Sequence, residues 1–235
     1  MVTFDHVKKL FGSVVALSDV TFHIAPGEFV FFVGPSGAGK TTVMRLLIRE
    51  YLPSEGDILF SGTSVLGLKQ RDIPRLRSDI GLVFQDFQLF KEKTVRENLE
   101  VMLAVKGVEQ DEWQARIEHV LGLVGLADRV DQFPGQLSGG ESQRAAIARA
   151  LVTGPELIFA DEPTGNLDWD TASGVMELLK KINDEGKTII VTTHHKKLVD
   201  EYRGRVITLE NGKVKSDTGK TKKSPSGKAT RDEKK

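Results

Sequence analysis

The chain has 235 residues, enough for one globular domain with a sizeable core. Lysine plus arginine number 33 and aspartate plus glutamate also number 33, so the overall charge favours neither nucleic acid nor an acidic membrane as a partner. Cysteine is absent, which excludes disulfides and cysteine-ligated metal, and we expect neither export nor a membrane span, because no secretory signal and no apolar run of ~20 residues is found.

Short apolar runs bounded by turn residues predict buried strands, and segments of helical period lie between most of them. The predicted strands are Val20 to Ile24, Phe29 to Val33, Ile80 to Phe84, Leu157 to Ala160 and Thr188 to Thr192. The predicted helices are Thr41 to Arg49, Val95 to Val105, Glu112 to Val124, Gln143 to Leu151 and Thr171 to Asn183. This alternation predicts an α/β fold with a mainly parallel sheet, and a strand near Thr3 to Val7 is expected to join the first of these runs in an antiparallel flank.

Two regions depart from the alternation. Between about 88 and 143 helix follows helix with no strand candidate, which predicts a helical subdomain inserted into the sheet core. Residues 216–235 hold almost no apolar residue, and they carry seven basic residues against three acidic ones, a net of +4. We expect a disordered basic tail there, either solubilising or in contact with anionic lipid.

A glycine-rich stretch from Gly34 to Thr41 reads Gly-Pro-Ser-Gly-Ala-Gly-Lys-Thr, follows a predicted strand and opens a predicted helix. The spacing and the context match a phosphate-binding loop. Glycines are needed because the backbone wraps the β-phosphate with its N–H groups pointing inward, and the helix N-terminus adds further donors. Lys40 is expected to neutralise the β- and γ-phosphates, and the Thr41 hydroxyl to ligate Mg²⁺.

Two carboxylates, Asp161 and Glu162, end the apolar strand that begins at Leu157. Asp161 is expected to reach the Mg²⁺ sphere, usually through water, and Glu162 to polarise the attacking water. Such a pair alone is as typical of a solvated turn as of a site. Together with a phosphate loop, it predicts a nucleotide hydrolase.

The segment Leu137-Ser138-Gly139-Gly140-Glu141-Ser142-Gln143 precedes a predicted helix and resembles the signature motif of the ABC (ATP-binding cassette) family. A serine and two glycines at a helix N-terminus form a second anion site. The alternative is an ordinary capping box, with Glu141 three residues after Ser138.

The remaining motifs of that family occur in the expected order. Gln85 resembles the glutamine that touches Mg²⁺ or the water, Asn166-Leu167-Asp168 resembles the D-loop, and His194 resembles the switch histidine that contacts the γ-phosphate. Phe11 stands where the family usually has an aromatic residue that stacks on adenine, often tyrosine, and His195 stands where aspartate is common.

The resemblance implies an ABC nucleotide-binding domain over residues 1–215, which binds and hydrolyses ATP with Mg²⁺ and pairs as a head-to-tail homodimer in the ATP state. It implies Glu162, His194 and Gln85 as catalytic residues and Thr41, Gln85 and Asp161 as metal ligands. The nucleotide-binding residues that it implies are Phe11, Gly34, Pro35, Ser36, Gly37, Ala38, Gly39, Lys40, Thr41, Thr42, Ser138, Gly139, Gly140 and Asp168.

Within the family, the stretch from Ala160 to Asp168 and the segment Thr94-Val95-Arg96-Glu97-Asn98 resemble the FtsE branch of bacterial cell-division ATPases. That resemblance implies a peripheral protein on the cytoplasmic face of the membrane, coupled to an FtsX-like integral membrane subunit that regulates peptidoglycan hydrolysis. ATPases of lipoprotein-release (LolD) and macrolide-exporter (MacB) type share the stretch from Ala160 to Asp168, so they remain alternatives. A soluble ABC ATPase is a further alternative. No nucleic-acid partner is expected.

Overall fold

Four of the apolar runs of the sequence lie side by side as β3, β8, β7 and β6 of a six-stranded sheet in the computed structural model, which describes residues 1–219 of the chain. The strand order is β10-β9-β3-β8-β7-β6, and all pairs are parallel except β10 with β9. The strands are β3 (Phe29–Val33), β6 (Ile80–Phe84), β7 (Leu157–Asp161), β8 (Thr188–Thr193), β9 (Arg205–Glu210) and β10 (Lys213–Asp217). The parallel strands therefore share one carboxyl-terminal edge, where ligands of open α/β sheets bind.

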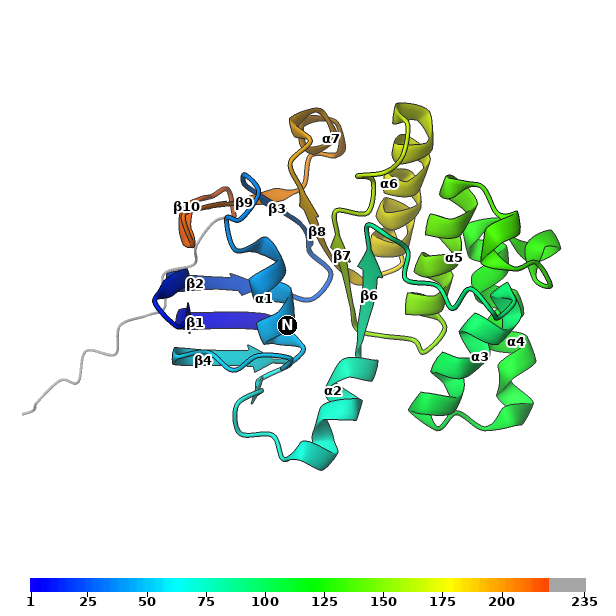
Figure 1. Ribbon diagram of the computed structural model, residues 1–235, viewed down its shortest axis with the longest axis horizontal. Coiled ribbons are helices and arrows are strands. Elements are labelled where there is room, and N and C mark those ends of the chain that lie inside the picture. The colour runs from blue at the N-terminus through cyan, green and yellow to red at the C-terminus, as the bar shows by residue number, and fades with distance from the viewer. Residues whose placement is uncertain (220–235) are drawn as a thin grey trace, which may run out of the picture.

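A second, antiparallel sheet of four strands forms the predicted flank, in the order β2-β1-β4-β5. Its strands are β1 (Val2–Phe11), β2 (Val14–Ile24), β4 (Glu55–Phe60) and β5 (Thr63–Ser64). Helix α1 (Lys40–Leu47) follows β3 and packs with this sheet, and α2 (Ile73–Ser78) precedes β6 (Figure 1).

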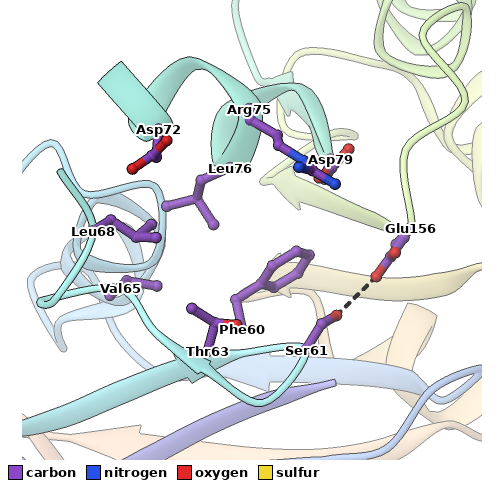
Figure 2. A pocket seen from close by; sticks show the side chains of 10 residues that line it. All are labelled: Phe60, Ser61, Thr63, Val65, Leu68, Asp72, Arg75, Leu76, Asp79 and Glu156. Carbon is purple, nitrogen blue, oxygen red and sulfur yellow. Dashed lines mark hydrogen bonds between the residues drawn. The ribbon is translucent and has the colours of Figure 1, made fainter. Parts of the chain in front are cut away.

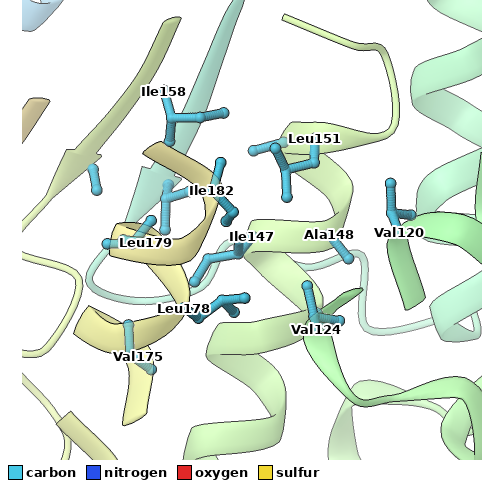
Figure 3. Close-up of a cluster of buried hydrophobic side chains, with 14 of the residues drawn as sticks. Val120, Val124, Ile147, Ala148, Leu151, Ile158, Val175, Leu178, Leu179 and Ile182 are labelled. Carbon is cyan, nitrogen blue, oxygen red and sulfur yellow. The ribbon is translucent and has the colours of Figure 1, made fainter. Parts of the chain in front are cut away.

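Side chains that alternate along the central strands fill two cores, one on each face of the larger sheet. On β3, Val30 and Phe32 face the antiparallel sheet and α1, whereas Phe29 and Phe31 face the opposite core. That second core is covered by α3 (Val95–Lys106), α4 (Gln110–Val124), α5 (Gly139–Leu151) and α6 (Trp169–Asp184). In Figure 3, α5 places Ile147 toward α6 and Ala148 toward α4, so α5 joins the helical region to the sheet.

The stretch from 88 to 143, which is described throughout, contains α3, α4, short 3-10 turns and the start of α5 but no strand. Figure 1 shows these helices grouped beyond β6 at one end of the molecule. The arrangement has the form of an inserted helical region, and its separate domain status stays a prediction.

Several boundaries differ from the sequence prediction. The tail does not begin at residue 216, because Ser216 and Asp217 belong to β10 and pair with Thr208 and Ile207 of β9. The rest of the predicted disordered tail, residues 220–235, lies outside the described residues. Strands β4, β5, β9 and β10 and helices α2 and α7 (Lys196–Tyr202) were not predicted.

Among residues 1–219, no helix combines the length and the apolar character that crossing a bilayer requires.

Candidate functional site

The predicted phosphate loop joins the carboxyl-terminal end of β3 to α1, and glycine is sterically required at two of its positions. A Cβ on Gly34 would collide with the carbonyl oxygen of Leu209, and a Cβ on Gly39 would lie 2.6 Å from Leu17 Cδ2. Gly39 also has φ of 105°, in the left-handed region that favours glycine. Pro35, Ser36 and Gly37 are exposed, whereas Ala38 is buried beneath them, so the loop presents its backbone to solvent.

Lys40, the first residue of α1, is buried although it is charged, with 6% of its surface exposed. Its ammonium group donates to the carbonyl oxygens of Gly34 at 2.8 Å and Pro35 at 3.2 Å, and it lies 3.5 Å from Glu162 Oε1. These contacts hold the ammonium beside the loop. Thr42 follows on the same first turn and is partly buried.

The two predicted carboxylates lie at the carboxyl-terminal edge of β7. Asp161 is opposite Thr192 of the neighbouring strand β8, whose hydroxyl donates to Asp161 Oδ1 at 2.5 Å, and the Thr41 hydroxyl donates to Asp161 Oδ2 at 2.9 Å. The adjacent Glu162 has a positive φ of 49°, and its N–H donates to the Thr192 hydroxyl at 2.9 Å. Thr192 thus bonds to both acidic residues. It was not among the predicted site residues. Its signal was present in the sequence, since Thr192 ends a predicted strand two residues before His194.

His194 follows β8 and contacts the carboxylate of Glu162. Its Nδ1 lies 2.8 Å from Glu162 Oε2, so the carboxylate lies between the imidazole of His194 and the ammonium of Lys40. The three side chains come from segments that are distant in sequence and meet because β3, β7 and β8 are neighbours in the sheet.

Gln85 extends the line of β6 into the same region. Its Nε2 donates to Asn166 Oδ1 at 3.1 Å, and Asn166 Nδ2 donates back to the carbonyl oxygen of Gln85 at 3.2 Å. A hollow at this point is lined by Thr41, Phe84, Gln85, Asp86, Asp161 and Glu162, which brings together all three predicted metal ligands.

Ser138, in contrast, makes no hydrogen bond to the phosphate loop within residues 1–219. It caps α5 in the capping box that the sequence also suggested: its hydroxyl accepts from the N–H of Glu141, and Glu141 Oε2 accepts from the N–H of Ser138 at 2.9 Å. Hydrogen bonds stabilise this carboxylate and lower the pKa of Glu141 to about 2. The bond from the Ser138 N–H contributes most, followed by those from the Ser138 hydroxyl and from Arg129. The signature residues therefore form a pre-ordered helix N-terminus, next to Leu167 and Thr171, which approach Gly139 and Gly140.

Asp168 caps α6, where it accepts from the hydroxyl of Thr171 at 2.7 Å and from its N–H at 3.0 Å, and these bonds lower the pKa of Asp168. Phe11 ends β1 with 41% of its surface exposed. Its ring packs edge-on against Tyr51, with centroids 5.1 Å apart, and Lys9 Nζ lies 4.8 Å from its centroid. The exposed aromatic group fits a stacking role, but no contact joins it to the phosphate loop among the described residues.

A second cavity lies at the opposite ends of β6 and β7 and takes no part in this cluster. Figure 2 shows Ser61 donating to Glu156, at 2.8 Å, beside an apolar floor that includes Phe60 and Leu76. None of the predicted site residues lines it.

Comparison with known proteins agrees with these motifs. The family model described as ABC transporter matches residues 17–165. The chain is 46% identical to the cell division ATP-binding protein FtsE of Streptococcus pneumoniae (strain D39), over 92% of this chain and 94% of the relative. It is 46% identical to FtsE of Mycobacterium tuberculosis, covering 92% and 95%, and 42% identical to FtsE of Escherichia coli K12, covering 93% and 99%.

Among solved structures, the chain is similar to the ATP-binding cassette MJ0796 in a dimeric post-hydrolysis state bound to ADP and Pi. The TM-score is 0.82 at 37% identity, with 92% of this chain and 97% of that chain covered. It is also similar to cbiO1 of Clostridium perfringens, part of the ABC transporter complex cbiONQ, with a TM-score of 0.85, 30% identity and coverage of 92% and 87%.

Proposed function

The chain belongs to the ABC transporter family, as its motifs predicted, and from that membership we propose that it hydrolyses ATP between two copies of itself to drive a membrane partner in bacterial cell division. Its ATPase activity follows from the family and from the likeness to a cassette that holds ADP and Pi. The observation that carries the proposal is the cluster in which the Glu162 carboxylate lies between Lys40 and His194 at the end of the parallel strands.

In the proposed reaction the phosphates lie over the N–H groups of the loop from Gly34 to Thr41, and Lys40 neutralises the β- and γ-phosphates. Glu162 polarises the water that attacks the γ-phosphorus, and the bond to the bridging oxygen breaks to release ADP. His194 holds this carboxylate through its 2.8 Å hydrogen bond and reaches the γ-phosphate. Gln85 orients the water from the end of β6.

Thr41, Gln85 and Asp161 would hold Mg²⁺. They offer hydroxyl, amide and carboxylate oxygens, the donors that Mg²⁺ takes, and they line one hollow in which the oxygens of Thr41 and Asp161 are 2.9 Å apart. The ion, when bound with ATP, neutralises charge on the phosphates.

The second half of the nucleotide site is proposed to come from a partner copy. Ser138, Gly139 and Gly140 form a helix N-terminus, Ser138 makes no hydrogen bond to the phosphate loop within residues 1–219, and Asp168 caps the adjacent helix. In a head-to-tail dimer each such N-terminus faces the nucleotide on the phosphate loop of the other chain. The similar cassette MJ0796 is dimeric in its post-hydrolysis state, which supports this arrangement.

The membrane partner is proposed to dock at the segment from Asp86 to Phe90. A groove there is lined by Phe87, Leu89, Phe133 and Pro134 among others, and Phe90 and Phe133 are 46% and 44% exposed. Exposed aromatic side chains around a groove are typical of partner sites. We propose an FtsX-like integral membrane subunit that regulates peptidoglycan hydrolysis as this partner, and the cytoplasmic face of the membrane as the place where the chain works. The cell-division names of the FtsE relatives support the division role.

Purification of the tagged chain from membranes, with identification of the membrane protein that accompanies it, tests the assignment. An FtsX-like protein, together with ATP hydrolysis that depends on Glu162, is expected. A lipoprotein-release or exporter subunit in its place would leave the ATPase mechanism standing and overturn the division role.

A further inference from the structure

Arg149 is a buried cation near the carboxyl-terminal end of α5. Only 9% of its surface is exposed, and within residues 1–219 it forms no ion pair with a carboxylate. Burial lowers the pKa of Arg149, yet an arginine side chain stays charged in proteins. A buried charge is costly unless polar groups compensate it, so Arg149 needs other polar partners.

Those contacts go to the proposed docking segment. The guanidinium Nη1 donates to the carbonyl oxygen of Gln88 at 2.5 Å, and Nη2 donates to the carbonyl oxygen of Phe87 at 3.2 Å. The Cζ atom also lies 5.8 Å from the centroid of the Phe90 ring. The planar fork of one arginine thus binds two consecutive carbonyl groups through two separate nitrogens and also lies over one aromatic ring, a geometry that the single nitrogen of a lysine ammonium does not reproduce.

The backbone at those two residues is strained. Phe87 has φ of 61° and Gln88 has φ of 49°, both in the left-handed region that residues with a Cβ seldom adopt. Such conformations persist only when the surroundings over-determine them. The paired hydrogen bonds from Arg149 supply such a constraint.

The same helix carries the signature motif at its other end. Helix α5 runs from Gly139 to Leu151, and Ser138 caps it. It also packs closely on β6, because a Cβ on Gly81 would lie 2.7 Å from the carbonyl oxygen of Ala150. Displacement of the segment after β6 therefore acts on helix α5, whose N-terminus Ser138 caps.

We propose that Arg149 is a positioning residue that fixes the strained segment Phe87–Gln88 to the signature helix, so that movement of the docking segment and movement of Ser138 are one event. Transmission from a membrane protein rests on the proposed function. The link between the segment and the helix does not, and it is tested on the chain alone.

The test compares Arg149→Lys with a control, Arg116→Lys, which changes a partly exposed arginine paired with Glu112 on α4. Hydrogen exchange is followed at the amides of 87–90 and 138–143, with ATP affinity and hydrolysis rate measured in parallel. For Arg149→Lys we expect exchange at 87–90 and at 138–143 to rise about tenfold or more, and hydrolysis to fall. ATP affinity stays within about twofold, because the phosphate loop lies elsewhere. The Arg116 control is unchanged in all three measurements.

A second change separates positioning from a general packing role. Glycine adopts a positive φ without strain, so Gln88→Gly added to Arg149→Lys is expected to restore protection and activity. Lost packing around the guanidinium would not be restored by a glycine at an exposed position. Failure of this rescue, or unchanged exchange in Arg149→Lys, overturns the proposal.

If Arg149→Lys does not fold, the native chain decides the matter. Amides of 87–90 and of the last turns of α5 are expected to open in one step, with the same free energy across a urea series. Opening of the segment at low urea while α5 stays protected would show that the two are independent, contrary to the proposal.

Discussion

The imidazole of His194 and the carboxylate of Glu162 lie 2.8 Å apart, although the two residues are 32 positions apart in the chain. The other carboxylate oxygen faces Lys40 at 3.5 Å, so Glu162 is held at both oxygens at the mouth of the phosphate loop. A carboxylate fixed in this way is suited to polarise water rather than to bind the nucleotide base.

The first prediction concerns that carboxylate. Glu162→Gln keeps its shape and removes its charge, so hydrolysis should fall by roughly 10²-fold or more, the scale of general-base contributions, while ATP binding persists. Steady-state phosphate release and the affinity for a fluorescent ATP analogue give the two values. An active Glu162→Gln chain, or one that no longer binds ATP, contradicts the assignment.

The second prediction concerns the shared site. Lys40→Ala and Ser138→Arg should each abolish hydrolysis alone, because each dimer of one variant lacks a group at both sites. A mixed dimer keeps one intact site, so activity should return on mixing. Hydrolysis is measured across mixing ratios, and dimers are detected by size-exclusion chromatography. No recovery despite mixed dimers would place Ser138 outside the partner's site.

Sequence patterns predicted best the strands with nearly continuous apolar runs, because such runs are typical of strands buried on both faces. Predicted and observed bounds coincide for β3 and β6. Strands β4 (Glu-Gly-Asp-Ile-Leu-Phe) and β9 (Arg-Val-Ile-Thr-Leu-Glu) were missed because their apolar stretches are short and have charged residues beside them, and their partners β1 and β3 are remote in sequence. Tertiary pairing decides such half-exposed strands.

The start of α5 shows a second limit. The prediction began this helix at Gln143, yet the helix begins at Gly139, although glycines such as Gly139 and Gly140 have low helix propensity. The reciprocal bonds of Ser138 and Glu141 offset that cost in the first turn. Motif spacing located the ends of the strands in the candidate site, but the Thr192 bonds to Asp161 cross between strands and needed the sheet register.

The third prediction concerns β10, the strand that continues beyond residue 215, the predicted end of the domain. Arg205 donates to Asp217 at 2.7 Å and to Glu28 at 2.7 Å, and the side chains of Arg205 and Asp217 are 14% and 15% exposed. Burial raises the pKa of Asp217, but the hydrogen bonds from Arg205 and the Gly219 N–H and the charge of Arg205 outweigh burial and lower that pKa. Asp217→Asn should therefore reduce the free energy of unfolding at pH 7 by about 2 kcal/mol, less than for a fully buried pair.

The sign of the pH dependence follows from that lowered pKa. The ion pair contributes stability above the unfolded-state pKa of about 4 and loses it as pH falls through the folded-state value. The difference between Asp217→Asn and the native chain should thus shrink in urea titrations at about pH 3. Asp184→Asn, which breaks an exposed pair with Lys180 on α6, serves as the control and should change stability by about 0.5 kcal/mol or less. Equal effects of the two substitutions would contradict the anchoring role.

The fourth prediction concerns the docking groove. Phe87→Ala combined with Phe90→Ala removes one aromatic side chain that lines the groove and one that is 46% exposed in the same segment, and it should weaken co-purification of the membrane partner, because aromatic side chains dominate such interfaces. ATP affinity of the isolated chain should be unchanged, since Lys40 and Asp161 lie at other strand ends. Co-purification from detergent extracts and nucleotide titration are the two measurements.

Because Phe90 also packs over Arg149, its loss could act through that contact as well, and Phe133→Ala separates the two causes. Phe133 lines the same groove from a different segment of the chain, is 44% exposed and has no contact with Arg149 among the described hydrogen bonds and ring contacts. Val105→Ala, on an exposed position of α3, is the matched control. If docking is at the groove, Phe133→Ala lowers co-purification and Val105→Ala does not. If only the Phe87 and Phe90 double variant loses the partner, and its thermal unfolding midpoint falls as well, the aromatic pair packs the two parts of the chain together and the partner docks elsewhere.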